Sequence, residues 1–210
     1  MTNTTQNNVN ITNLETKFRQ DFAIIAGWVG FGSKVLDLGC GDGTLLNYLR
    51  GSLEVKGYGV EKDDVNWLAC MQNGTNVIQM DLEAGLSGFE NQSFDTVILS
   101  QTLQAMHNTE EIVQEMLRVG REIIVTFPNF GYWRNRLQIA GGGHMPVSNA
   151  LPYQWFDTPN VHLCTINDFD KFCKNYKITV IERKVITDGK EMSFMPNLLG
   201  NLAMYRLKAT

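Results

Sequence analysis

Short apolar runs alternate with amphipathic segments through the middle of the chain, and this alternation predicts the class of fold. Five apolar runs bounded by turn residues have the length of β-strands, and they cover residues 35–38, 58–60, 77–80, 96–99 and 123–127. Apolar positions at helical spacing lie between these runs, in residues 44–49, 63–72 and 108–117. Strands that alternate with helices imply parallel pairing with helices on both faces of the sheet. The sequence therefore predicts a doubly wound α/β fold.

Two of the predicted helices carry capping residues at their start. Asn108 followed by Glu111, and Thr165 followed by Asp168, each place a capping side chain three residues before an acidic one. The second of these helices should end at about Asn175.

The two ends of the chain depart from the simple alternation. Residues 1–12 are rich in Asn and Thr and predict a disordered tail, and the apolar spacing over 14–29 predicts a helix before the first strand. Strands are predicted over 179–186 and 201–207 with only a turn-rich loop between them, so they should pair antiparallel. We expect a single domain over residues 13–210.

Composition narrows the function classes. The 210 residues are 43% hydrophobic and 19% charged, which suits one globular core. The net charge of −4 disfavours a protein that coats nucleic acid. No apolar run approaches the roughly 20 residues of a membrane span, and the polar first residues do not resemble a signal peptide. Four cysteines without a CxxC pair predict no metal site and a cytoplasmic protein with reduced thiols.

The clearest local motif is Val-Leu-Asp-Leu-Gly-Cys-Gly-Asp-Gly at residues 35–43, where an apolar strand runs into a glycine loop and then a helix. Gly39, Gly41 and Gly43 allow a tight turn and a close approach of backbone to ligand. The GxGxG spacing leaves less room for a pyrophosphate than GxGxxG does, which disfavours a nicotinamide-dependent oxidoreductase. A purely structural turn is the alternative.

Acidic residues stand at the ends of the first three predicted strands. Asp37, two residues before the first glycine, would meet a cationic amino group. Glu61 follows Gly41 by 20 residues, the separation at which a carboxylate accepts ribose hydroxyls. Asp81 would accept from an adenine amine, or else cap the turn that follows it. Together the three describe a site for an adenosine that carries a positively charged amino acid.

Residues 35–43, Glu61, Asp81 and 94–98 together resemble the motif series of class I S-adenosylmethionine-dependent methyltransferases. The resemblance implies a seven-stranded, mostly parallel, Rossmann-like sheet with an antiparallel last strand, and S-adenosylmethionine or S-adenosylhomocysteine as the ligand. It places the glycine loop near the methionine part, Glu61 at the ribose and Asp81 at the adenine. The cofactor-binding set that it implies is Asp37, Gly39, Cys40, Gly41, Gly43, Glu61, Lys62, Asp81, Leu82 and Ser100.

Three longer strings, residues 101–105, 126–138 and 151–165, resemble the MetW family of methionine-biosynthesis proteins. With the glycine loop, this resemblance runs from about residue 22 to residue 183. It implies a role with homoserine O-acyltransferase, the enzyme that acylates homoserine early in methionine synthesis. A hetero-oligomer with that enzyme is expected, with neither nucleic acid nor membrane as partner.

Catalytic residues stay unassigned. Gln101 and Gln104 follow the fourth predicted strand, where small-molecule methyltransferases commonly have a His, and glutamine cannot take a proton at neutral pH. His107 is either the nearest candidate base or surface at a helix start, and His162 is either catalytic or bonded to backbone. Two functions stay open: a subunit that binds S-adenosylmethionine and activates or regulates the acyltransferase, and a small-molecule methyltransferase.

Aromatic side chains are concentrated in residues 127–156, which hold seven of the 21 Phe, Trp and Tyr residues. We call residues 128–164 the aromatic segment, an insertion that would form a lid, a partner surface or ordinary core. Gly141–Gly143 within it predict a hinge. Trp, Tyr and Arg supply much of the energy at interface centres. The predicted partner-binding residues are therefore Phe130, Trp133, Arg134, Arg136, Tyr153 and Trp155.

Overall fold

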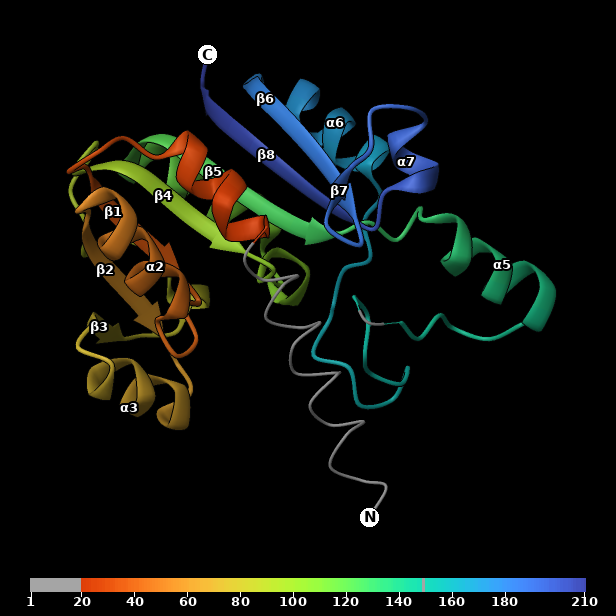
Figure 1. Cartoon of the computed structure of the whole chain (residues 1–210), viewed down its shortest axis with the longest axis horizontal. Coiled ribbons are helices and arrows are strands. Elements are labelled where there is room, and N and C mark those ends of the chain that lie inside the picture. The colour runs from red at the N-terminus through yellow and green to blue at the C-terminus, as the bar shows by residue number, and fades with distance from the viewer. Residues whose placement is uncertain (1–19, 149) are drawn as a thin grey trace.

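A mostly parallel β-sheet forms the centre of the protein (Figure 1). The computed structural model describes residues 20–148 and 150–210, and its sheet has the strand order β3-β2-β1-β4-β5-β8-β6-β7. The strands are β1 (Lys34–Leu38), β2 (Lys56–Glu61), β3 (Asn76–Gln79), β4 (Phe94–Ser100), β5 (Gly120–Pro128), β6 (Ile178–Thr187), β7 (Lys190–Glu191) and β8 (Leu202–Ala209). The predicted disordered tail lies outside the described residues.

Strand pairing confirms the predicted topology. β3, β2, β1, β4 and β5 pair in parallel, whereas β8 lies between β5 and β6 and is antiparallel to both. The sheet has one strand more than the seven expected, because the two residues of β7 pair antiparallel with the end of β6.

The helices that the spacing predicts are present. They are α2 (Thr44–Leu53), α3 (Asp64–Gln72), α4 (Thr109–Val119) and α6 (Ile166–Asn175). Residues 20–28 are helical as well, which is the described part of the predicted N-terminal helix. Thr165 and Asp168 form the expected capping box of α6. Asn108 stands at the N-cap position of α4 as expected, but its side chain makes no capping hydrogen bond, and its amide donates to the Glu83 carboxylate.

Two helices were not predicted. α5 (Trp133–Gly142) lies in the aromatic segment, and α7 (Pro196–Leu199) is a single turn before β8. The interpretation of Gly141–Gly143 as a hinge does not match this local structure. The first two of these glycines form the end of α5, and Gly143 caps it with a φ of 65°, a backbone conformation that suits glycine at a helix C-terminus.

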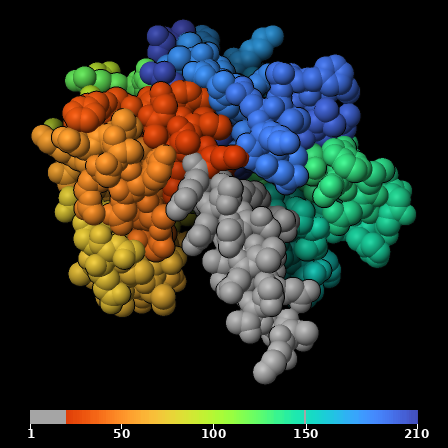
Figure 2. Space-filling model, in the orientation of Figure 1, coloured from red at the N-terminus to blue at the C-terminus, as the bar shows by residue number. Residues whose placement is uncertain are grey.

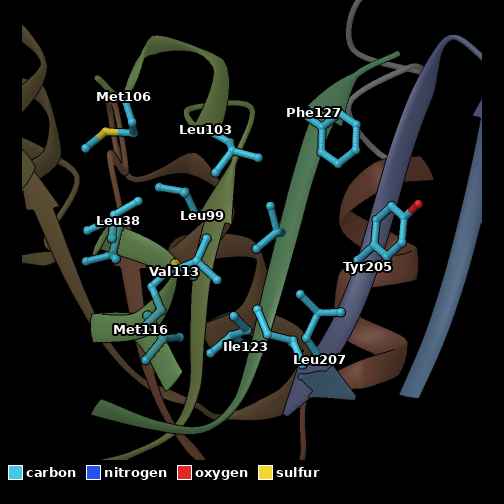
Figure 3. Packing of buried hydrophobic residues seen from close by; sticks show 14 of the residues in the cluster. Leu38, Leu99, Leu103, Met106, Val113, Met116, Ile123, Phe127, Tyr205 and Leu207 are labelled. Atoms are coloured by element: carbon cyan, nitrogen blue, oxygen red, sulfur yellow. The ribbon is translucent and has the colours of Figure 1, made fainter. Parts of the chain in front are cut away.

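The core has a layer on each face of the sheet, since successive side chains of a strand point to opposite faces. On β5, Ile123, Val125 and Phe127 pack in one cluster, and Ile124 packs in the other. Figure 3 shows the first cluster, in which side chains of α4 meet the strands. These two layers fix the strand ends from which the candidate site is built.

Candidate functional site

The glycine loop borders a cavity of about 380 Å³ at the carboxyl end of β1 and β4. Backbone N–H groups of Gly39 and Cys40 donate to the carbonyl oxygen of Val60, at 2.8 and 3.0 Å, and so hold the loop against β2. The cavity is lined by Phe22, Asp37, Gly39, Cys40, Gly41, Asp42, Thr44, Leu45, Ser100 and Gln101. Five residues of the predicted cofactor set therefore share one cavity: Asp37, Gly39, Cys40, Gly41 and Ser100.

Each of the three loop positions requires glycine for a different structural reason. All three have positive φ. A Cβ on Gly41 would meet no atom within 4 Å, so this glycine leaves open space at the cavity. A Cβ on Gly39 would lie 2.8 Å from Thr102 Oγ1, and one on Gly43 would lie 2.8 Å from Cys70 Sγ. Gly43 does not line the cavity, and its role in this structure is close packing between α2 and α3.

Asp37 is the electrostatic centre of this cavity. Its side chain is 2% exposed, and Oδ1 has no hydrogen-bond partner among the described residues. Burial, with a further contribution from the charge of Glu61, raises the pKa of the Asp37 carboxyl to about 8. A buried carboxyl without a partner is a costly arrangement that a cationic ligand group would relieve.

Glu61 holds the loop in place. Its Oε2 accepts from the backbone N–H of Gly41 at 2.9 Å, and its Oε1 accepts from those of Lys62 and Asp63 at 2.8 and 2.9 Å. The carboxylate therefore joins the glycine loop to the start of α3. Sequence spacing predicted a ribose contact here and did not foresee these backbone bonds. This geometry is compatible with a ribose contact, because Oε2 accepts only the Gly41 N–H and has a further lone pair for a hydroxyl group.

A second cavity, of about 550 Å³, lies at the ends of β2 and β3 and is lined by Lys62, Asp63, Gln79, Met80 and Asp81. Asp81 caps the short helix η1 (Leu82–Ala84) by accepting from the Glu83 N–H. This is the capping role that the sequence offered as the alternative to an adenine contact. Its other oxygen lies 3.8 Å from Lys62 Nζ, in an exposed ion pair. Leu82 belongs to the core rather than to this cavity. Asp37 thus lines the first cavity and Asp81 the second, while Glu61 lines neither and bonds to backbone of both.

Two further members of the set are tied to neighbours. The hydroxyl groups of Ser100 and Thr126 lie 3.1 Å apart. Cys40 Sγ lies 3.8 Å from Cys70 Sγ, and burial raises the pKa of both thiols. Neither thiol is therefore a nucleophile at neutral pH.

The candidate bases do not lie in the glycine-loop cavity. His162 Nε2 donates to the carbonyl oxygen of His107 at 3.1 Å, which agrees with the alternative of a backbone-bonded histidine. His107 lies 3.4 Å from the Glu83 carboxylate. Both histidines line a third cavity, of about 600 Å³, which no sequence motif indicates. It is bordered by η2 (Leu103–Ala105), the start of α4, the end of β5 and residues 162–172.

The aromatic segment exposes much of its apolar surface. Trp155 is 74% exposed, and Trp133 and Tyr153 are also exposed, whereas Phe130 is half-buried. The Arg134 guanidinium lies 5.4 Å from the Trp133 ring, while that of Arg136 donates to the Gly131 carbonyl. In Figure 2, α5 and its neighbours form a lobe at one side of the molecule.

Comparison with solved structures gives the class of protein. This fold, with an antiparallel strand set between two parallel ones, is that of the class I S-adenosylmethionine-dependent methyltransferases. A possible histamine N-methyltransferase from Thermotoga maritima has a TM-score of 0.68 at 14% identity, covering 98% of this chain and 96% of its own. Magnesium protoporphyrin IX methyltransferase from Synechocystis, with bound S-adenosylhomocysteine, has a TM-score of 0.66 at 17% identity, covering 95% and 86%.

Within this class, the chain belongs to the MetW family, described as methionine biosynthesis protein MetW, which it matches over residues 19–207. It is also 40% identical over 166 residues to the bifunctional methionine biosynthesis protein MetXA/MetW of Rhodopirellula baltica. That match covers 75% of this chain but only 26% of the relative. The MetW resemblance predicted from the sequence is therefore confirmed.

Two kinds of feature, a membrane-spanning helix and a metal-binding cluster, are absent from the described residues. None of their helices is both long and apolar enough to cross a membrane. No three His, Cys, Asp or Glu side chains among them come together in an arrangement that could hold a metal ion.

Proposed function

We propose that this protein binds S-adenosylmethionine or S-adenosylhomocysteine and acts, in the cytoplasm, with homoserine O-acyltransferase as its partner. The observation that carries the cofactor assignment is the Asp37 carboxyl, buried and without a partner on Oδ1, beside the open space at Gly41. A ligand with a cationic amino group and a compact backbone-facing part fits this arrangement.

The residues divide the ligand between the two strand-end cavities. Asp37 would hold the amino group, Gly41 would admit the methionine part, and Glu61 would keep the loop closed while Oε2 accepts from the ribose. Lys62 and Asp81 would border the adenine in the second cavity. When bound, S-adenosylmethionine supplies a methyl group on a cationic sulfur.

The partner assignment is supported by two observations. A relative's name joins MetXA and MetW in one protein, and MetX is a homoserine O-acetyltransferase. The exposed aromatic side chains of residues 128–164 suit the centre of a protein interface. The contact would be centred on Trp133, Arg134 and Trp155, with Phe130, Arg136 and Tyr153 around them.

Catalytic methyl transfer to a small molecule is the second candidate. It is favoured by the third cavity, because residues 100–104 border it on one side and the glycine-loop cavity on the other. Methyl transfer needs alignment more than a base, so the absence of an obvious base in the sequence does not exclude it.

One experiment separates these functions. The protein is mixed with the purified acyltransferase, their association is measured, and acyl transfer is assayed with and without S-adenosylmethionine. The proposal expects a complex whose acyl transfer differs from that of the enzyme alone. Absence of a complex would reject the partnership, and calorimetry that shows no binding of either cofactor form would reject the cofactor site.

A further inference from the structure

The third cavity is separate from the proposed cofactor site. Its volume of about 600 Å³ exceeds the 380 Å³ of the glycine-loop cavity, and the two have no lining residue in common. The loop of residues 100–104 stands between them, with Ser100 and Gln101 on the cofactor side and Leu103 and Gln104 on the other. A ligand in the third cavity would therefore leave the cofactor cavity open.

One wall of the third cavity is aromatic. Phe127, Phe169 and Phe172 form a continuous run, with ring centroids 4.9 Å apart for the first pair and 5.7 Å for the second. Figure 3 shows Phe127 and Leu103 toward the same end of the sheet core. Phe127 and Phe169 are 0% and 3% exposed, so the accessible part of this wall is the half-buried Phe172. An apolar ligand body on Phe172 would remove apolar area from water.

The charge of the cavity is negative. Glu110 and Asp168 line it together with the histidines His107 and His162, and no Lys or Arg is among its described lining residues. Asp168 is engaged in the capping box of α6. The Tyr176 hydroxyl donates to Glu110 Oε2 at 2.6 Å. Within the described part of the chain the Glu110 carboxylate makes no other hydrogen bond, so its Oε1 is available to a ligand. This charge disfavours carboxylates and phosphates and favours a cation.

Two further oxygens of the lining residues lack partners. Gln104 Oε1 and Thr109 Oγ1 are buried and accept no hydrogen bond from the described residues. Both residues line the cavity. A ligand with several N–H groups would supply the partners that both oxygens lack.

We infer that the third cavity binds a small compound in which a protonated amine is joined to an apolar body. The amine would lie at Glu110, and the apolar body would lie on Phe172, which Phe169 and Phe127 support from behind. This site does not depend on the proposed cofactor or partner, because none of its residues belongs to either predicted set.

The test compares two probes of similar shape and opposite charge. Binding of 2-phenylethylamine and of 3-phenylpropionate to the whole chain, without cofactor, is measured by ligand-observed NMR titration. The inference expects the amine to bind at least about tenfold more tightly than the carboxylate. Equal affinities, tighter binding of the carboxylate, or no binding of the amine would overturn it.

Variants locate the bound amine. Glu110→Gln keeps an acceptor for Tyr176 but removes the charge, and should weaken amine binding about fivefold or more. Glu111→Gln makes the same charge change on the next residue, which does not line this cavity, and should leave binding unchanged. Unchanged affinity in Glu110→Gln would overturn the assignment.

Two tryptophan variants test the position of the bound amine without changing any charge. Leu163 lines the cavity and is 41% exposed, so Leu163→Trp should block entry without disturbing the core. Leu68→Trp, at a 49% exposed position on α3, is its control. If the amine bound equally to both Trp variants, it would lie elsewhere on the protein and the inference would fail.

Discussion

The glycine-loop region, residues 35–81, and the aromatic segment, residues 128–164, depart from ordinary burial in opposite directions. In the first, carboxyl groups are inside: Asp37 is 2% exposed and Glu61 is 8% exposed. In the second, large apolar groups are outside, with Trp155 at 74% and Phe156 at 70%. Buried carboxyl groups favour a polar ligand, whereas exposed aromatic surface favours contact with another macromolecule. The difference indicates that the two regions serve different kinds of partner.

The largest effect expected within the glycine-loop region is that of Gly41→Val. A β-branched side chain at a φ of 56° is strained and would stand in the cavity, so cofactor binding should be abolished while the fold is kept. Calorimetry and circular dichroism measure the two properties. Gly74→Val is the control, because Gly74 has a φ of 69°, equally open surroundings and no place in the cavity. Retained binding in Gly41→Val would make the loop a structural turn only.

Glu61→Ala should have the next largest effect. It removes the acceptor of three backbone N–H groups and of the proposed ribose contact, so cofactor affinity should fall by about 2–4 kcal/mol. Titration calorimetry with S-adenosylhomocysteine measures this loss. Glu83→Ala is the comparison, since Glu83 accepts from His107 and Asn108 outside the site. An affinity equal to that of the unaltered protein would remove Glu61 from the site.

The aromatic segment should respond to a different set of changes. Trp133→Ala, Arg134→Ala and Trp155→Ala should each weaken the complex with the acyltransferase by about 2 kcal/mol. Cofactor affinity should be unchanged, because these residues do not line the cofactor cavities. Phe194→Ala is a control for Trp155→Ala, because Phe194 is 73% exposed, as Trp155 is at 74%, but lies outside the segment. A catalytic lid would give the reverse result, with methyl transfer lost and no effect on a complex.

The smallest expected effect is the release of protons when the cofactor binds. Because the pKa of Asp37 is about 8, this carboxyl is mostly protonated at pH 7 in the free protein, and a bound ammonium group favours its ionised form. Cofactor binding at pH 7 should therefore release about one proton, and the release should fall toward zero as the pH rises through 8. Calorimetry in phosphate and Tris buffers measures it. Asp37→Asn should release none, and release undiminished in that variant would exclude Asp37 as the source.

The sequence predicted those parts of the molecule that depend on neighbours along the chain. The strand–glycine–helix motif and the capping box of α6 are local patterns, and both formed as expected. α5 was missed because its apolar residues Leu137 and Ile139 are exposed, so no apolar face repeats at helical spacing. Asn108 takes the predicted N-cap position, but its side chain bonds to Glu83, 25 residues away, which the local pattern does not reveal.

The details of the site were hidden for the same reason. The bonds from Gly41 to Glu61 and the lack of a partner for Asp37 depend on how separate strands meet in the fold. The third cavity is assembled from four segments between residues 103 and 172, and no motif in any one of them indicates a hollow. Residue types predicted a ligand at the strand ends, but only the fold shows which carboxyl is left without a partner.

The position of β8 between β5 and β6 has a consequence for synthesis of the protein. During translation, β6 leaves the ribosome before the strand that must separate it from β5. Apart from the two residues of β7, it therefore has no correct neighbour in the sheet until residues 202–209 follow. Ala203, Met204 and Tyr205 of β8 are fully buried, which means that both core layers also remain incomplete until then. Such late, non-local pairing leaves strand edges open to wrong partners. The edges of β5 and β6 that face each other across β8 therefore stay unpaired until that strand is inserted.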